Sequence, residues 1–594
     1  MYPRRLGIGT TVAAVISVVL LIIGVVAGYF AGSAGAPSVT TTVTGPTTTV
    51  TGPTTTLTTT KTVEAGAPTT VTSTVTTTKT VTSTTTATAE PTKLTQYKDK
   101  IRIGTALRIE TTMDPANAIG YMAVNILYNV GAGLVRYKAG TSEIEPDIAS
   151  KWTISEDGTV YTFTLRQDAK FSNGNPVTAK TFEYSWRRAL KLKGAPTFFM
   201  GLVIEKPEDV KAIDDYTLQV KLKHPFAPFL SLIAISAAPS YPVDPTVVSE
   251  NDFYQGIYIG PGPYQISKYE RDIMMLLTPN PYYFGPKPAT PNIEIRWFSD
   301  SSALALALRN KDIDVVLRGG LSPSEITMFM QNPDFTVDMA VLVQNRMLML
   351  NTAQPPFTDK RVRQAVAYAV DRRSIVETVF QNTVFPLYSQ IPRGISGGAN
   401  YFKSIYGDGN IEKAKELLRA AGYSESNKMK FELTYDAQSY GVTEMNVAVL
   451  FKQQIEATGM AEVKLNPVDA AKFTELYVFQ PYPGLLQAFI FGWWADYLDA
   501  DDYLYCFYNS YWAGILGVYL NNTRIDQLLE EQRKLVDFED RLPLLVEIQK
   551  LGAEEASSVP LWQPRQEAVY IKGVEGVVLS PDGGSRYWLI RMPS

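Results

Sequence analysis

Residues 145–190 read EPDIASKWTISEDGTVYTFTLRQDAKFSNGNPVTAKTFEYSWRRAL. Within them, DGTVYTFTLRQDAKFSNGNPVT (157–178) alternates apolar and polar side chains and contains SNGN, which predicts a β-hairpin closed by that turn. TAKTFEYSWRRALK (178–191) has helical spacing, and Thr178 is a suitable N-cap. A strand pattern that runs directly into a helix pattern predicts a mixed α/β fold.

The same interleaving continues outside this stretch. KIRIGTAL (100–107) alternates like a strand, and residues 359–369 and 411–421 have helical composition, the second stopped by Gly422. A chain of 594 residues is too long for one compact core, so we expect two or three domains.

The first 32 residues form an apolar segment. Thr11 to Phe30, taken as a helix, would reach ~30 Å, the thickness of a bilayer's hydrocarbon layer. Arg4 and Arg5 precede this run, which predicts a cytoplasmic N-terminus and an external main body. A cleaved signal peptide is the alternative, because a basic start and an apolar core fit both. We expect a retained single-pass anchor in the cell membrane.

Residues 33–94 are dominated by threonine, and TTTVTGP occurs at 40–46 and again at 47–53. Such a segment has too little apolar surface to collapse into a core. Threonine-rich stretches with proline are typical of extended, often O-glycosylated stalks, and an unmodified linker would tether the main body equally well. We predict a Thr-rich disordered stalk.

The charge pattern excludes a nucleic-acid partner. Residues 1–94 hold five Lys and Arg against two Glu, and the other residues hold 50 basic and 57 acidic side chains, a net charge of −7. That is not the basic footprint that a nucleic acid requires. The single cysteine, Cys506, excludes intramolecular disulfides, and its aromatic surroundings predict a buried, inert thiol.

Little in the sequence points to catalysis. His224 is the only histidine and lies in LKHPFAPF, which is typical of a loop or surface position. A zinc site built on several histidines is therefore excluded. No GxSxG elbow precedes a helix, and no GxxxxGK[ST] phosphate loop is present. We predict that the chain is not an enzyme and has no metal or cofactor.

FGWWADYLDADDY (491–503) places four aspartates, Asp496, Asp499, Asp501 and Asp502, among aromatic rings. A glycosidase pair or a calcium site is conceivable from the residue types, but the run lacks the glycine and terminal glutamate of an EF-hand loop. Aspartates in such runs usually cap helices or face solvent.

Several segments resemble the extracytoplasmic solute-binding proteins of peptide-type ABC importers, solute-binding protein family 5. The most specific is 145–190. The other matching segments are DPANA (114–118), GLVRY (133–137), GPGPYQISKYE (260–270), NPYYFG (280–285), FTDKRVRQAVAYAVDRRSIV (357–376), AKELLRAAGY (414–423), GWWADYLDADDY (492–503) and SVPLWQ (558–563). The resemblance covers essentially all of residues 98–594, and the N-terminal segments look like an archaeal-type anchor and stalk.

The resemblance implies a two-lobed periplasmic-binding-protein-like fold with an extra third domain, the cluster C type. It places lobe I at 98–144, 263–347 and 561–594, the extra domain at 145–262 and lobe II at 348–560. These names are kept below for those residue ranges.

In peptide-binding members of the family, an aspartate in a W-x-A-D-Y context pairs with the ligand's α-ammonium group. Trp493, Ala495, Asp496 and Tyr497 match that pattern. Asp496 is therefore the expected ligand anchor, and the other three aspartates are expected to cap or be solvated. The alternative is that Asp496 pairs with an arginine of this chain. Of Trp493 and Trp494, one is expected to face the cleft and the other to join the core.

The resemblance places a second ligand-contacting segment at Ile119, Gly120 and Tyr121, where backbone groups would pair with a peptide's main chain. Gly120 would permit close approach, and Tyr121 would narrow the pocket or supply a stacking ring. Phe198, in GAPTFFM, falls near another pocket-lining position.

The predicted function is a cell-surface receptor that captures oligopeptides and delivers them to the permease subunits of an ABC importer. An oligosaccharide is the competing ligand, because sugar sites also use aromatic rings and carboxylates; a nickel complex fits poorly with one histidine. A structural surface protein and a sensor for a membrane kinase are rival functions. The first predicts repeats in the main body, which the sequence lacks outside the stalk, and the sequence does not separate the second from transport.

Overall fold

The computed structural model describes residues 96–109, 112–118, 120–234, 240–318, 320–437, 441–477, 480 and 482–594. The predicted anchor (1–32) and stalk (33–94) lie outside the described residues. Within the described ranges, no helix combines the length and apolar character that a membrane crossing requires. Residues 96–594 form one compact unit, described below by itself.

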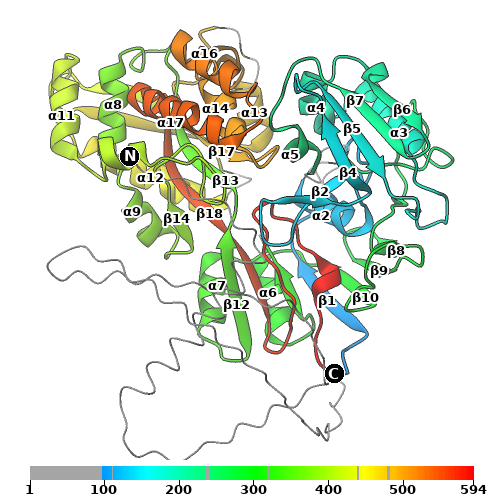
Figure 1. The fold of residues 1–594 in the computed structure, drawn as a ribbon. Coiled ribbons are helices and arrows are strands. Elements are labelled where there is room, and N and C mark those ends of the chain that lie inside the picture. The colour runs from blue at the N-terminus through cyan, green and yellow to red at the C-terminus, as the bar shows by residue number, and fades with distance from the viewer. Residues whose placement is uncertain are drawn as a thin grey trace, which may run out of the picture. The chain divides into compact units, whose positions relative to one another are not determined.

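One large mixed sheet extends through both lobes (Figure 1). Its strands, in spatial order, are β16 (Ala461–Val468), β15 (Met429–Asp436), β17 (Ala488–Trp494), β13 (Gln344–Leu350), β18 (Ser558–Ile571), β11 (Val315–Leu317), β1 (Lys100–Thr105), β10 (Asn292–Trp297), β9 (Met274–Pro279) and β8 (Tyr264–Glu270); β12 (Phe335–Val341) and β14 (Val384–Pro386) also pair with β18. β1 confirms the strand predicted at 100–107, since Ile101 and Ile103 are buried between parallel neighbours β10 and β11.

β18 joins the two halves of this sheet. Its first residues pair with β13, and its last residues pair with β12 and β11 (Figure 1). The chain also passes from one half of the sheet to the other at the turn between β12 and β13, next to β18. β13 and β18 therefore continue across the predicted borders at 347 and 560, and these boundaries remain predictions. Two strands that pass from one lobe to the other are the connection about which such lobes rotate.

The extra domain contains a separate antiparallel sheet in the order β4 (Ala149–Ile154), β5 (Val160–Leu165), β7 (Thr217–Lys221), β6 (Val210–Asp214). Tyr161, Phe163 and Leu165 point into the core from β5, as their alternation predicts. The predicted hairpin partner is wrong, because β5 pairs with β4 and β7. After β5 the chain does turn back at the predicted SNGN, where an isolated bridge joins Lys170 and Pro176 and the Val177 N–H donates to the Ala169 carbonyl at 2.9 Å, but no strand follows. Proline has no N–H to continue a ladder.

Helix α3 (Ala179–Leu192) confirms the helix expected after this strand, with Thr178 at the N-cap. The Thr178 N–H donates to the Thr181 hydroxyl at 3.0 Å, and Phe182 and Trp186 are fully buried one turn apart. The helices predicted near 359–369 and 411–421 are α8 (Lys360–Ala369) and α11 (Ile411–Ala420), and Gly422 follows α11 with φ of +93°.

The remaining described elements complete the layers. In chain order they are α2 (Tyr121–Val130), β2 (Val135–Tyr137), β3 (Ile144–Pro146), α4 (Phe198–Val203), α5 (Phe229–Ala234), α6 (Ser301–Arg309), α7 (Pro323–Met330), α8 (Lys360–Ala369), α9 (Arg372–Ser374), α10 (Tyr401–Tyr406), α11 (Ile411–Ala420), α12 (Gly441–Glu456), α13 (Ala470–Tyr477), α14 (Ala500–Tyr508), α15 (Ser510–Ile515), α16 (Thr523–Gln532) and α17 (Phe538–Glu555). Helices α8, α11, α12 and α17 lie around the lobe II part of the sheet (Figure 1).

A buried ion pair attaches the extra domain to lobe I. Asp114, from the DPANA segment, accepts hydrogen bonds from Arg188 of α3 at 2.6 and 3.0 Å and from the Tyr254 N–H at 2.7 Å. Both charged side chains are almost completely buried. This ion pair fixes the chain a few residues before Ile119, where the predicted ligand-contacting segment begins.

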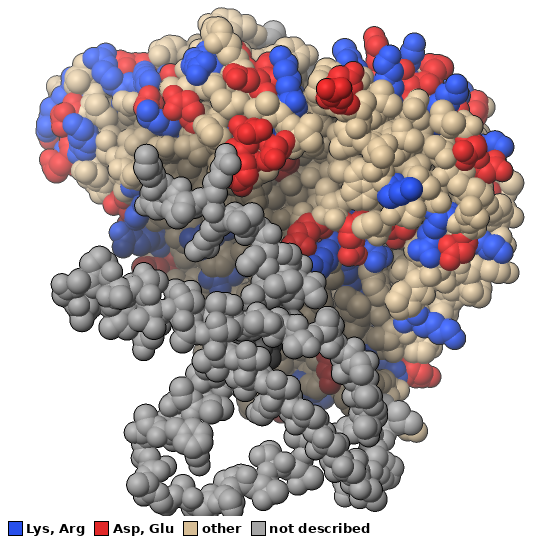
Figure 2. Space-filling model, in the orientation of Figure 1, with Lys and Arg blue, Asp and Glu red and all other residues tan. Residues whose placement is uncertain are grey.

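The surface charges are mixed. On the face in Figure 2, the Lys and Arg side chains of the described residues are interspersed with Asp and Glu. His224 lies in an exposed bend and Cys506 is buried, as the sequence predicts.

Candidate ligand-binding site

The aspartate-rich stretch joins a strand to a helix. β17 ends at Trp494, and α14 begins at Ala500 after a short loop. Asp499 is the N-cap of α14, and its carboxylate accepts the Asp501 N–H at 2.8 Å. A cap of this kind satisfies one of the free N–H groups in the first turn. The capping role predicted for this stretch is confirmed for Asp499.

Two of the four aspartates are neutralised by arginines from later in the chain. Asp499 pairs with Arg541 at 2.6 Å, and Asp501 pairs with Arg533 at 2.8 Å. Asp501 is completely buried and also accepts the Tyr497 hydroxyl at 2.7 Å. The expectation that Asp501 and Asp502 cap or face solvent is wrong, because α14 turns both side chains into the core.

The other two aspartates lie together without a cation. The Asp502 carboxylate accepts the Trp493 indole N–H at 3.0 Å and the Asp496 backbone N–H at 3.3 Å. Among the described residues, no Lys or Arg makes an ion pair with Asp496 or Asp502, and one Asp502 oxygen is buried without a hydrogen-bond partner. The alternative that Asp496 pairs with an arginine is thus wrong for the described part of the chain.

Burial changes the acidity of this pair. It raises the pKa of Asp496 to about 8. The pKa of Asp502 is raised well above its ordinary value, first by burial and then by the negative charge of Asp496. Two like charges in a site of low polarity do not both ionise readily. A cationic group brought to Asp496 would relieve this penalty.

The aromatic residues of the stretch take different positions. Trp493 packs edge-on against Phe507 with ring centroids 5.3 Å apart, so it belongs to the core. Tyr497 is buried with its ring 5.7 Å from that of Phe226 in the extra domain. Their predicted roles in ligand contact are not tested by these positions.

Trp494 faces lobe I, where it contacts Arg318. The Arg318 guanidinium carbon lies 3.7 Å from the centroid of the Trp494 ring and 4.5 Å from that of Tyr121. The Tyr121 hydroxyl lies 3.2 Å from that of Ser585. This cluster brings together the start of α2, the residue after β11, the end of β17 and the C-terminal loop.

Gly120 and Tyr121 begin a helix. Gly120 is the residue before α2 with φ of +81°, a conformation that favours glycine. The first turn of α2 therefore presents its backbone N–H groups at this cluster. Ile119, the third residue predicted here, lies outside the described residues.

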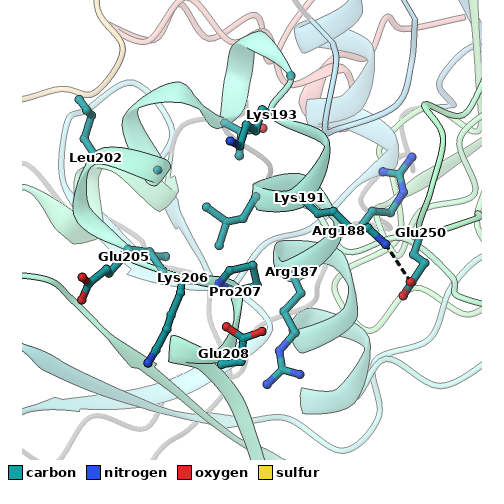
Figure 3. A pocket seen from close by; sticks show the side chains of 15 residues that line it. Arg187, Arg188, Lys191, Lys193, Leu202, Glu205, Lys206, Pro207, Glu208 and Glu250 are labelled. Atoms are coloured by element: carbon teal, nitrogen blue, oxygen red, sulfur yellow. Dashed lines mark hydrogen bonds and ion pairs between the residues drawn. The ribbon is translucent and has the colours of Figure 1, made fainter.

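Phe198 lies elsewhere, in the extra domain. It begins α4, whose Gly201 and Leu202 line a cavity of about 810 Å³ against α3 (Figure 3). Charged side chains surround that cavity, and Figure 3 shows Lys191 pointing to Glu250, 3.1 Å away. No aspartate of the 491–503 stretch lines it. The Phe198 side chain is not described.

The lobes are in contact beside the site. The Tyr137 hydroxyl of lobe I donates to the Ser231 carbonyl at 2.9 Å and accepts the Leu498 N–H of lobe II at 3.2 Å. The Ala227 N–H donates to the Arg533 carbonyl at 3.1 Å. One apolar core also runs from the four-stranded sheet into α14. The extra domain and lobe II are thus in contact in the described conformation.

Sequence reasoning missed Arg318. It has a φ of +24°, which is strained for a residue with a side chain and costs roughly 1–3 kcal/mol. Such strain is common at ligand sites. The signal was a charged residue directly after the apolar run VVL and before two glycines, in DVVLRGG (314–320).

Comparison with known proteins identifies relatives of the whole described unit. Residues 143–514 match the family model "Bacterial extracellular solute-binding proteins, family 5 Middle". The dipeptide-binding protein DppE of Bacillus subtilis is 29% identical over 499 residues, 80% of this chain and 88% of that protein. The nickel-binding periplasmic protein of Escherichia coli is 33% identical over 295 residues, 49% of this chain and 55% of that protein.

Among solved structures, the ABC transporter-associated periplasmic binding protein DppA from Helicobacter pylori in complex with the peptide STSA is similar, with a TM-score of 0.69 and 25% identity. The match covers 83% of this chain and 98% of that one. The predicted mixed α/β, periplasmic-binding-protein fold is confirmed.

Proposed function

Because the chain belongs to the bacterial extracellular solute-binding proteins of family 5, we propose that it captures oligopeptides between its lobes at the cell surface and delivers them to the permease of an ABC importer. Family membership makes it an extracytoplasmic binding protein rather than an enzyme, as the sequence predicts. The cargo is argued from this chain's own residues, because one relative is named for dipeptides and another for nickel.

The state of Asp496 is the observation on which the peptide proposal depends. Arginines neutralise Asp499 and Asp501, whereas Asp496 meets no cation of the described chain. A buried carboxylate needs a close cation or a proton. The α-ammonium group of a peptide supplies that cation, and the solved relative from H. pylori holds a peptide.

The aromatic rings favour a peptide over an oligosaccharide. A sugar platform needs an open ring face. Trp493 packs in the core, Tyr497 is 1% exposed, and Arg318 already lies over Trp494. The rings of the 491–503 stretch are therefore largely committed to protein contacts.

In this function the ligand is bound and released without a chemical reaction. The ligand stabilises the closed form in proportion to its preference for that form, as the lobes rotate about β18 and the β12–β13 connection. A membrane anchor with a Thr-rich stalk would keep the receptor near the permease and raise its effective concentration there.

Calorimetry on the full-length chain tests the proposal. The chain is unfolded and refolded to remove carried-over ligand, and is titrated with a mixed peptide pool and then with short β-linked oligosaccharides. We expect peptides to bind and Asp496→Asn to weaken binding by about a hundredfold or more, because a buried charge loses its partner.

Asp502→Asn is the matched control. Asp502 is the neighbouring acid, and burial together with the charge of Asp496 raises its pKa well above the ordinary value, which disfavours its ionised form. Its replacement by a neutral amide is expected to leave peptide affinity within about threefold of the wild type. Binding of sugars but not peptides, or full peptide affinity in the Asp496 variant, would contradict the proposal.

A further inference from the structure

The loop before α16 carries the one N-x-[ST] triplet of the chain, at Asn521, Asn522 and Thr523. Such a triplet accepts an N-linked sugar in proteins that reach the outside of the cell, but it also occurs by chance. A triplet can be modified only where the fold leaves it accessible. Asn521 is exposed between α15 and α16, and Thr523 is exposed at the first position of α16.

The fold uses the middle residue of the triplet and leaves the other two. Asn522 caps α16, because its side-chain oxygen accepts the Arg524 and Ile525 N–H groups at 3.1 and 3.2 Å. Within the described part of the chain, neither the Asn521 amide nor the Thr523 hydroxyl makes a hydrogen bond. The two side chains that N-glycosylation requires are therefore not needed for folding.

Asn521 also lines an open hollow of about 470 Å³ in lobe II. Sites for small molecules measure roughly 300–1,000 Å³. Hydroxyl groups of Thr352, Thr358 and Ser510 line the hollow and can hydrogen-bond a polar, uncharged ligand. None of the residues proposed above to contact the transported ligand lines it, so the hollow is a separate site.

The charges in the hollow cancel. Arg363 and Glu555 are the charged residues that line it, and they pair with each other at 2.9 Å. Lys360 also lies 3.2 Å from the Glu555 carboxylate. A hollow without an unpaired charge favours a neutral occupant over an ion.

One aromatic ring beside Asn521 is open to solvent. Tyr482 is 76% exposed, the highest value among the large apolar side chains of the described residues. Its ring stands edge-on to that of Tyr519, with the centroids 5.6 Å apart, and both residues line the hollow. An open ring beside hydroxyl groups suits a sugar, whose C–H face packs on the ring while its hydroxyls form hydrogen bonds.

We propose that Asn521 is N-glycosylated and that the first sugars of the glycan pack in this hollow against Tyr482. The Asn521 side-chain nitrogen loses a proton and forms a bond to the anomeric carbon of a sugar. The bond between that carbon and the phosphate of a lipid-linked saccharide donor breaks, and the lipid phosphate leaves. This modification requires the extracytoplasmic location of the family and is independent of the proposed peptide cargo.

Mass spectrometry tests the attachment on the full-length chain isolated from the cells that naturally make it. We expect the proteolytic peptide that contains residue 521 to carry a saccharide, located on Asn521 by fragmentation. Asn521→Gln and Thr523→Ala should remove that mass, whereas Thr523→Ser should retain it, because serine keeps the hydroxyl of the triplet. An unmodified Asn521 in the wild type would overturn the proposal.

Chemical nitration of tyrosines tests the packing. The glycan should shield Tyr482, so this ring should react several-fold faster in Asn521→Gln than in the wild type. Tyr282 of lobe I, which is 44% exposed, is the matched control and should react at the same rate in both. Equal reactivity of Tyr482 in both proteins would show that the glycan does not occupy the hollow, and that part of the proposal would be wrong.

Peptide calorimetry separates this site from the proposed function. Asn521→Gln should bind the peptide pool as tightly as the wild type, because no proposed ligand contact lines the hollow. A loss of peptide affinity in this variant would place the hollow in the ligand site and overturn its assignment to a glycan. If the wild type bound no peptide but carried the saccharide, the peptide function would fail and the glycosylation site would stand.

Discussion

At the scale of single residues, the protein separates four neighbouring aspartates by what each one meets. Asp499 pairs with Arg541 of α17, and Asp501 pairs with Arg533 in the segment after α16, so both carboxylates have a structural role. Within the described ranges Asp496 forms no ion pair and lies beside Asp502, another carboxylic acid. The role of each aspartate therefore depends on the cation within reach, and we propose that the ligand supplies the cation for Asp496.

Peptide affinity should depend on pH through Asp496. Its pKa of about 8 means that the carboxylate is largely protonated below pH 8 and must lose a proton to bind an ammonium group. Affinity is expected to rise from pH 6 to 8 by up to about tenfold per unit, and to fall above pH 8 as the peptide's own α-ammonium deprotonates. Calorimetry in buffers of different ionisation enthalpy should detect about one proton released per peptide at pH 6–7.

The same shift has a consequence for stability. A raised pKa in the folded state means that the contribution of Asp496 is fully present below its unfolded pKa and is lost as pH rises through about 8. The unliganded wild type should therefore lose stability relative to Asp496→Asn over that range. If the wild type and Asp496→Asn showed the same dependence of peptide affinity on pH, and the same dependence of stability on pH, this assignment would be wrong.

At the scale of secondary-structure elements, buried charges decide how segments are held. α3 packs on lobe I through Arg188 and Asp114, and α14 is held at its start by Asp499 with Arg541. Elements so attached are rigid, and rigid elements position ligand groups accurately. The loop 495–499 gains its fixed geometry from the strand before it and the capped helix after it.

Asp114→Asn should destabilise the protein strongly. The change leaves the completely buried Arg188 without its counter-charge, and removing one member of a buried pair typically costs about 3–5 kcal/mol. Denaturant unfolding monitored by tryptophan fluorescence measures the loss. Asp215→Asn, which removes the exposed pair with Lys180, should leave the unfolding transition unchanged. Equal effects of the two substitutions would refute the role given to Asp114.

At the scale of the described unit, the lobes meet through a few polar contacts and one continuous apolar core. Tyr137 is central because its hydroxyl bonds Ser231 of the extra domain and Leu498 of lobe II. Contacts that exist only in the closed form add to ligand affinity without touching the ligand.

Tyr137→Phe should therefore weaken peptide binding about fivefold, the effect of one hydrogen bond of about 1 kcal/mol. Hydrogen exchange at the Leu498 amide should become faster in the unliganded protein. Tyr264→Phe is the control, since it removes a buried hydroxyl that bonds the Thr290 carbonyl at 2.7 Å inside lobe I. If the control weakens binding as much as Tyr137→Phe, the effect is one of general stability.

The N-terminal segment makes a separate prediction. If residues 1–32 form a retained anchor, the full-length chain should stay in the membrane fraction after alkaline carbonate washing, because a spanning apolar helix is not released by charge or pH. A chain that begins at residue 95 should be released. Recovery of the full-length chain in the soluble fraction would favour the cleaved signal peptide.

Local sequence was enough to predict several parts of this protein. The alternation in β5, the helix after Thr178, the stop at Gly422 and the burial of Cys506 follow from side-chain spacing and polarity within a few residues. These properties depend on neighbours in the chain, so they can be read along it. The family resemblance at 145–190 extended this to the mixed α/β fold, confirmed by the solved relatives.

Other features depend on contacts between segments that are distant in the sequence. β5 pairs with β4 and β7 rather than with the residues that follow it. Arg541 and Arg533 lie 42 and 32 residues after the aspartates they neutralise. Arg318 reaches Trp494 from the other side of β18. The 491–503 stretch alone determined that carboxylates and aromatic rings would lie together. Only the tertiary structure decided which carboxylate has no cationic partner among the described residues. The position of a cation in space is set by how the elements pack and not by spacing along the chain.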